Sequence, residues 1–206
     1  MDYKNLLLRF IFSIFLFCIY VFSINNNNFL LIIGCLLYLI IFYEIYRYFN
    51  KFFIIITIYI AVSFLCFIFY IFNFFDQYSF NLLVSVVIIF DTFGYITGSF
   101  FGKTYIFKKI SPNKTLEGYL GGVFCTNILI FLFIFYFLNI NFLTDTLFLI
   151  NSLIIFSFLG DLIQSYFKRK NKIKNSSNLL PGHGGFFDRF DSFIFAMFFL
   201  FAYNYI

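Results

Sequence analysis

Residues 52–72 read FFIIITIYIAVSFLCFIFYIF, a run of 21 residues without a charged side chain. A helix needs about 20 apolar residues to cross the hydrocarbon core of a bilayer, so this stretch predicts a transmembrane helix. Similar runs fill most of the 206-residue chain, which is 63% hydrophobic and contains 40 Phe. Soluble domains are only about half apolar, and the sequence therefore predicts an all-α polytopic membrane protein.

The apolar runs divide the chain into about seven expected spans of membrane-crossing length. They are residues 6–24, 29–45, 52–72, 80–99, 119–138, 147–167 and 193–206, and the last should extend back toward Phe186. The first lacks a small-x-small cleavage site, so we expect a retained helix rather than a signal peptide. The four cysteines lie singly in these runs and are interpreted as packed hydrophobic residues.

The basic residues lie on one side of this topology. With a cytoplasmic N-terminus, all 14 Lys and Arg fall on the cytoplasmic side, and the outer connections at 25–28, 73–79 and 139–146 contain none. Cytoplasmic loops are enriched in Lys and Arg, so we predict a multi-pass protein of the inner (cytoplasmic) membrane with its N-terminus inside. The net charge of +5 is attributed to this topology, and no nucleic-acid partner is expected.

The stretch DTFGYITGSFFG, Asp91–Gly102, is the first of four polar motifs. Asp91 follows nine apolar or small residues and should lie inside the bilayer, where a carboxylate is costly without a function or a partner. Gly94, Gly98 and Gly102 recur every four residues, which is typical of a helix-packing seam.

The second motif, SPNKTLEGYLGG, spans Ser111–Gly122. Ser-Pro favours a turn, and the glycines allow close approach of backbone to a ligand. Lys114 and Thr115 suit a phosphate; the alternative is a basic juxtamembrane turn in which Lys114 faces lipid headgroups. Glu117 could be a helix N-terminal acid or a polar ligand, and the sequence does not separate these alternatives.

The third motif, GDLIQSYFKR, spans Gly160–Arg169. Asp161, Ser165 and Lys168 lie at i, i+4 and i+7, so a helix places them on one face. This polar stripe predicts the wall of a water-filled cavity on the cytoplasmic side. The alternative is a structural ion pair between Asp161 and another helix.

The fourth motif, LPGHGGFFDRFDS, spans Leu180–Ser192. Pro-Gly-His-Gly-Gly prevents regular structure and exposes N–H groups suited to anionic oxygens. Asp188 and Asp191 project together if the last helix begins near Phe186. Oxygen donors without cysteine favour Mg²⁺ over zinc. His183 is interpreted as structural or phosphate-contacting, with a catalytic role as the alternative. Carboxylates that hold Mg²⁺, with cations and amides that hold phosphate, predict a phosphoryl- or nucleotidyl-transfer site with a lipid substrate.

The last two motifs together resemble the phosphatidate cytidylyltransferases, whose signature is Ser-x-x-Lys-Arg, then Lys-Asp, then Pro-x-His-Gly-Gly-x-x-Asp-Arg-x-Asp. The matching residues here are Ser165, Lys168, Arg169, Lys174, Asn175, Pro181, His183, Gly184, Gly185, Asp188, Arg189 and Asp191. The segments from Asp91 to Lys103 and from Ser111 to Gly122 also look like the family, so the resemblance covers about Asp91–Phe193.

The resemblance implies an enzyme that converts CTP and phosphatidate into CDP-diacylglycerol and pyrophosphate for phospholipid biosynthesis. It implies Mg²⁺ as the cofactor, a monovalent cation such as K⁺ as a further candidate, the lipid bilayer as the medium and a homodimer as the assembly. One membrane domain is then expected, with N-terminal helices over residues 1–80 and a catalytic region with a cytoplasm-facing site over residues 81–206.

The resemblance also implies residue roles. Asp161 and Asp188 are expected to bind the metal. The expected catalytic residues are Asp161, Asp188, Asp191, Lys168 and Arg189. The expected substrate-binding residues are Asp91, Lys114, Thr115, Glu117, Ser165, Arg169, Lys174, His183, Gly184 and Gly185.

The chain departs from the family in two respects. Asn175 stands where the family has Asp, and we expect this acid to be dispensable because Asp161, Asp188 and Asp191 remain. The chain is also shorter than most bacterial members, which we expect to affect the lipid-facing wall or dimerisation more than the chemistry. The alternatives are a CTP-dependent polyprenol kinase, an archaeal-type lipid cytidylyltransferase, and an inactive or transport-type membrane protein.

Overall fold

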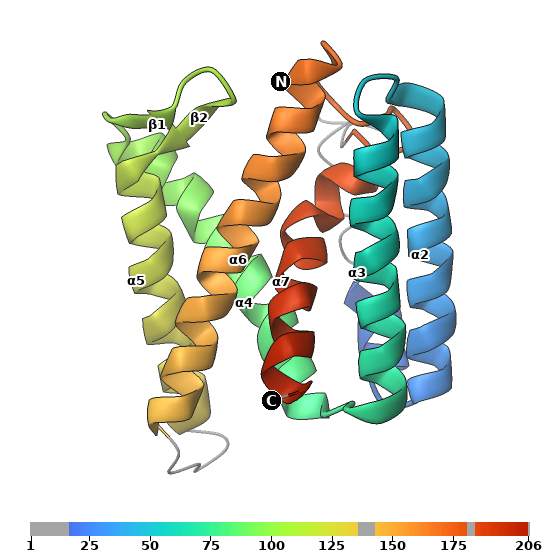
Figure 1. Ribbon diagram of the computed structural model, residues 1–206. Helices are drawn as coiled ribbons and strands as arrows, with labels where there is room; N and C mark the ends of the chain where they lie inside the picture. The colour runs from blue at the N-terminus through green and yellow to red at the C-terminus, as the bar shows by residue number, and fades with distance from the viewer. Residues whose placement is uncertain (1–16, 136–142, 181–183, 206) are drawn as a thin grey trace. The chain divides into compact units, whose positions relative to one another are not determined.

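The structure is a computed structural model that describes residues 17–135, 143–180 and 184–205 (Figure 1). The helices are α2 (Asn27–Tyr48), α3 (Phe53–Asn73), α4 (Gln77–Phe101), α5 (Leu116–Phe133), α6 (Leu143–Lys170) and α7 (Phe187–Tyr205). Two short strands, β1 (Tyr105–Phe107) and β2 (Ser111–Thr115), lie between α4 and α5. The all-α prediction is confirmed, with this hairpin as an addition to it.

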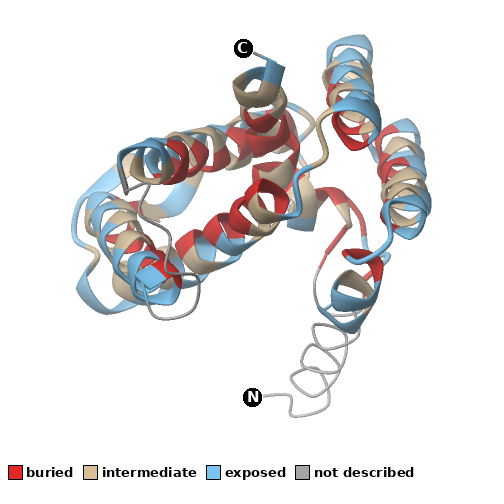
Figure 2. Cartoon of the chain, turned by 90° about the horizontal axis from the view of Figure 1, so that it is seen from below, coloured by how far each residue is buried: buried red, intermediate tan, exposed pale blue. Residues whose placement is uncertain are grey.

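Helices α2 to α6 provide five candidate membrane spans, as judged by length and apolar composition. They match the second to sixth spans expected from the sequence. The first expected span lies mostly outside the described residues, although residues 17–23 are helical. The last corresponds to α7, which begins at Phe187, as predicted. Each long helix has a buried and an exposed face (Figure 2), and exposed apolar side chains such as Phe72 (71% exposed) suit contact with lipid.

The chain forms two compact units, each of which is described by itself. The first comprises Met1–Phe75 and Phe167–Asp191, and the second comprises Asp76–Tyr166 and Ser192–Ile206. Helices α6 and α7 each contribute residues to both. The functional division near residue 80 that the sequence suggested stays a prediction.

In the first unit, α2 and α3 pack through a buried polar contact and a close aromatic contact. The hydroxyls of Tyr38 and Ser63 are 2.7 Å apart and buried. Gly34 of α2 lies directly against the ring of Phe67, where any side chain at position 34 would collide. The turn between these helices is held by Asn171, whose side chain accepts the N–H groups of Asn50 (3.0 Å) and Lys51 (2.7 Å).

In the second unit, α4 and α5 pack through glycines, as the packing-seam interpretation predicts. A Cβ atom at Gly118 would lie 2.8 Å from the carbonyl oxygen of Gly94 and 3.0 Å from the Cα of Gly98. Thr97 donates its hydroxyl to the Gly118 carbonyl at 3.3 Å. The absence of side chains on these glycines lets the two backbones approach closely.

Gly118→Ala should destabilise the second unit by about 1–3 kcal/mol, because the added methyl meets backbone atoms that cannot rotate away. Gly94→Ala is the matched control, since its Cβ would meet only the Gly118 carbonyl oxygen at an ordinary 3.6 Å. Thermal unfolding in detergent would measure both. Equal melting temperatures for the two variants would contradict the interpretation that Gly118 lies in a tight packing seam between α4 and α5.

The hairpin corrects one sequence expectation. Ser111-Pro112 was expected to open a turn, but Ser111–Thr115 is strand β2, antiparallel to β1, with Phe107 opposite Ser111. The turn lies at residues 108–110, where the Ile110 N–H donates to the Phe107 carbonyl. Pro112 is tolerated because a two-stranded sheet has only edge strands, where a missing N–H need not interrupt a ladder.

Candidate functional site

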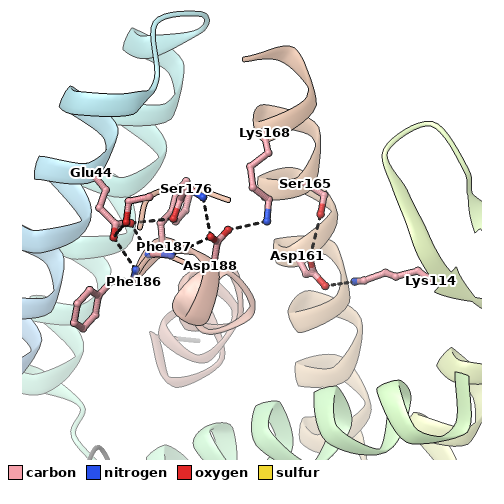
Figure 3. A network of polar contacts seen from close by, with 11 residues as sticks. Glu44, Lys114, Asp161, Ser165, Lys168, Ser176, Phe186, Phe187 and Asp188 are labelled. Atoms are coloured by element: carbon pink, nitrogen blue, oxygen red, sulfur yellow. Dashed lines mark hydrogen bonds and ion pairs between the residues drawn. The ribbon is translucent and has the colours of Figure 1, made fainter. Parts of the chain in front are cut away.

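Asp188, in the first turn of α7, is the centre of a polar cluster in the first unit (Figure 3). Its Oδ1 accepts a hydrogen bond from the Lys168 ammonium at 2.8 Å. Its Oδ2 accepts the backbone N–H groups of Ser176 at 2.7 Å and Gly185 at 3.2 Å. The Lys168 and Asp188 side chains are only 14% and 11% exposed. The Lys168 ammonium and two backbone N–H groups therefore fix the Asp188 carboxylate.

The charge state of Asp188 follows from these contacts. Burial alone would raise the pKa of its carboxyl. The charge of Lys168 and the three hydrogen bonds outweigh burial, so the pKa lies below its usual value. Asp188 is therefore ionised at neutral pH, as a metal ligand must be.

Glu44 of α2 lies in the same unit and is fully buried. It accepts four hydrogen bonds from residues that flank the glycine-rich motif, namely Ser176, Ser177, Phe186 and Phe187. Glu44 was not among the site residues predicted from the sequence. Its one signal is that it is the only acidic residue between Asp2 and Asp76, and it stands in an apolar helix, where an acid needs a partner.

Asp161 is the centre of a separate cluster in the second unit (Figure 3). Its Oδ2 lies 2.5 Å from the Lys114 ammonium of β2. Its Oδ1 accepts the Ser165 hydroxyl at 3.2 Å, which confirms that these two residues share a face of α6. The Lys114 ammonium also lies 4.5 Å from the centre of the Phe158 ring, a cation–π contact. The second and third motifs thus meet within one unit.

Thr115 and Glu117 have structural contacts at the start of α5. The Thr115 hydroxyl accepts the Gly118 N–H at 3.1 Å and so caps the helix. The Glu117 carboxylate accepts the N–H groups of Lys103 (3.1 Å) and Thr104, together with the Thr104 hydroxyl. Glu117 is thus a first-turn acid that anchors the chain leaving α4, and its expected role in substrate binding stays a prediction.

The remaining sequence-predicted residues lie on several elements of the two units. Asp91 is exposed on α4, Asp191 is buried on α7 after its first turn, and Arg169, Lys174 and Arg189 are exposed. Gly184 has a φ of +86°, a left-handed conformation that favours glycine. His183 lies outside the described residues. Asp161 and Asp188 belong to different units, so the expectation that they share a metal stays a prediction.

The donor set is consistent with Mg²⁺. The part of the chain that the structure describes contains no group of three or more His, Cys, Asp or Glu that could hold a metal. Mg²⁺ does not need such a group, because proteins usually bind it through one or two carboxylates, with waters and substrate phosphates completing the octahedron. Asp161 and Asp188 supply hard oxygen donors, each beside a lysine that suits a phosphate.

Comparison with known proteins gives consistent matches. The family model described as "Cytidylyltransferase family" matches residues 2–206. The phosphatidate cytidylyltransferase of Staphylococcus haemolyticus is 45% identical over 113 residues, which are 54% of this chain and 43% of the relative. Those of Staphylococcus aureus and Staphylococcus epidermidis are 42% and 43% identical over stretches of the same length. The matched stretch thus spans less than half the length of these relatives.

Proposed function

This chain belongs to the cytidylyltransferase family, and we propose that it transfers the cytidylyl group of CTP to phosphatidate, releasing pyrophosphate and forming CDP-diacylglycerol. One observation carries the proposal. The Asp188 carboxylate of the family signature is largely shielded from solvent and is fixed by Lys168 and two backbone N–H groups. The relatives named phosphatidate cytidylyltransferase support the choice of substrates.

The proposed chemistry is an in-line displacement at phosphorus. A phosphatidate phosphate oxygen attacks the α-phosphorus of CTP, and the bond from that phosphorus to the bridging oxygen of pyrophosphate breaks. The phosphomonoester is already anionic near neutral pH, so it needs little help from a general base. The barrier lies in bringing two anions together and in the charge that develops on pyrophosphate.

Positively charged residues of this chain would lower that barrier. Lys168 and Lys114 each lie beside a carboxylate. Arg169, which follows Lys168, and Arg189, which follows Asp188, add exposed cations. We propose these four cations as phosphate contacts that orient CTP and phosphatidate. Mg²⁺, when bound by the aspartates, would supply charge neutralisation of the phosphates. Asp191 and Asp91 are proposed as supporting groups.

We also propose the cytoplasmic side of the inner membrane as the location of the site. All 14 basic residues fall on that side in the topology inferred from the sequence. CTP is a soluble nucleotide, whereas phosphatidate is a membrane lipid, so a site at the cytoplasmic end of apolar helices would have access to both. A homodimer is proposed on the family resemblance alone.

Labelled CTP tests the function directly. Purified protein in detergent would be incubated with phosphatidate, Mg²⁺ and CTP labelled at either the α- or the γ-phosphate, and the lipid would then be extracted. We expect α-label in the lipid. Transfer of γ-label would indicate a lipid kinase instead, and label from neither position, in protein that is folded, would contradict the proposal.

Asn175→Asp tests the departure from the family signature. The side chain at position 175 is exposed, and the adjacent contact to Asp188 comes from the backbone of Ser176, which the substitution leaves in place. We therefore expect the rate of α-label transfer to change by no more than about threefold, as for most exposed substitutions. A much larger increase would mean that Asn175 impairs the site.

A further inference from the structure

We infer that Glu44 is a positioning residue for the site, holding the start of α7, and with it Asp188, against α2. This inference rests on the proposed function, because it takes Asp188 as part of the reaction site. Nothing in the family signature points to Glu44, which precedes the first signature residue, Ser165, by more than 100 residues. The N-terminal helices would then contribute to the chemistry and not only to the lipid-facing wall.

The contacts of Glu44 use both carboxylate oxygens fully. Oε1 accepts the Ser177 hydroxyl at 2.7 Å and the Phe186 N–H at 2.7 Å. Oε2 accepts the Ser176 hydroxyl at 3.0 Å and the Phe187 N–H at 2.9 Å. Each oxygen thus receives one hydroxyl and one backbone donor (Figure 3). We call these five residues the Glu44 cluster.

All four partners are donors, so the cluster requires an acceptor-only group at its centre. An ionised carboxylate meets that requirement, whereas an amide would direct its own N–H groups at donors. Among the described residues no Lys or Arg is within ion-pair distance of Glu44. The buried charge is therefore balanced by hydrogen-bond donors and by the N-terminal end of α7, whose first N–H groups it accepts.

The Glu44 cluster determines the position of Asp188 in two ways. Phe187, whose N–H binds Glu44, is the residue immediately before Asp188. Ser176 donates its hydroxyl to Glu44 and its backbone N–H to Asp188, so a single residue joins the two carboxylates. Loss of the Glu44 contacts would therefore release Phe187, at the start of α7, and also Ser176, which donates to the Asp188 carboxylate.

Glu44→Gln tests the inference, with Tyr38→Phe as the control. Glu44→Gln should lower kcat for α-label transfer by about 30- to 100-fold, because a displacement of about 1 Å at a reacting group can cost that much. The KM for CTP should change by no more than about threefold, since the phosphate contacts remain. Amide hydrogen exchange at Phe186 and Phe187 should accelerate. Glu44→Asp, which keeps the charge on a shorter side chain, should recover part of kcat.

Tyr38→Phe removes another buried polar contact from the same helix, that with Ser63. It should lower thermal stability without changing kcat or the exchange at Phe186 and Phe187. If Glu44→Gln does not fold, the double variant Ser176→Ala/Ser177→Ala removes two of the four donors without introducing a new polar group. It should lower kcat in the same direction by a smaller factor.

The outcomes separate the inference from the proposed function. A folded Glu44→Gln protein, or a folded double serine variant, with unchanged kcat and unchanged exchange would overturn the positioning role and leave the proposed function intact. An unmodified protein that transfers no label would refute the proposed function. The exchange data would then still show whether Glu44 holds the start of α7, and unchanged exchange would refute that as well.

Discussion

Asp188→Asn should abolish CDP-diacylglycerol formation, lowering α-label transfer by roughly 10²–10³-fold or more, the loss typical when a key electrostatic group is removed. An ammonium and two backbone N–H groups, all of them donors, contact the Asp188 carboxylate. An asparagine of the same shape must direct its NH₂ at one of them. The variant therefore loses the negative charge and also disturbs the contacts that orient position 188.

Asp76→Asn is the matched control for this prediction. Asp76 caps α4 by accepting the N–H groups of Tyr78 and Ser79, and asparagine caps helices about as well as aspartate. Its rate of label transfer should stay close to that of the unmodified protein, as measured in the same lipid-extraction assay. Robust transfer by a folded Asp188→Asn protein would exclude Asp188 as an essential group.

The membrane helices could be predicted from the sequence because length and hydropathy nearly determine them. Residues 52–72, without a charge, coincide within one or two residues with α3, Phe53–Asn73. The shared face of Asp161 and Ser165 was also predictable, because helical spacing alone places them together. The β1–β2 hairpin was not predictable in this way, since its strands are short and Thr115 alone among their residues is buried, so that hydropathy carries little signal there.

Which lysine pairs with which aspartate could not be read from spacing. Lys114 lies on β2, and its pairing with Asp161 of α6 depends on how the hairpin packs. Lys168 shares α6 with Asp161, yet its ammonium contacts Asp188. Glu44 is the strongest case, because its partner Ser176 is 132 residues away and outside any local pattern. A buried acid in an apolar helix does imply a partner, but it does not indicate which one.

Gly185→Ala should lower activity nearly as much as Asp188→Asn, although it adds only a methyl group. A Cβ atom at position 185 would lie 2.6 and 2.7 Å from the two Glu44 carboxylate oxygens and closer still to the Ser176 hydroxyl. These atoms cannot move aside freely, since each is committed to the Glu44 cluster. Relief of the clash must displace the segment that carries the Gly185 N–H, one of the donors to Asp188.

We expect Gly185→Ala to lower kcat for label transfer by about 100-fold, as a displacement near 1 Å at a reacting group predicts. Gly94→Ala, which makes only the ordinary 3.6 Å contact, separates this effect from the general consequences of a Gly→Ala change and should retain activity. Hydrogen exchange at Phe186 and Phe187 should accelerate in the Gly185 variant only. If both variants kept full activity, the segment before α7 would accommodate a methyl group at position 185. Tight packing of that segment against Glu44 could then not be what holds Asp188 in place.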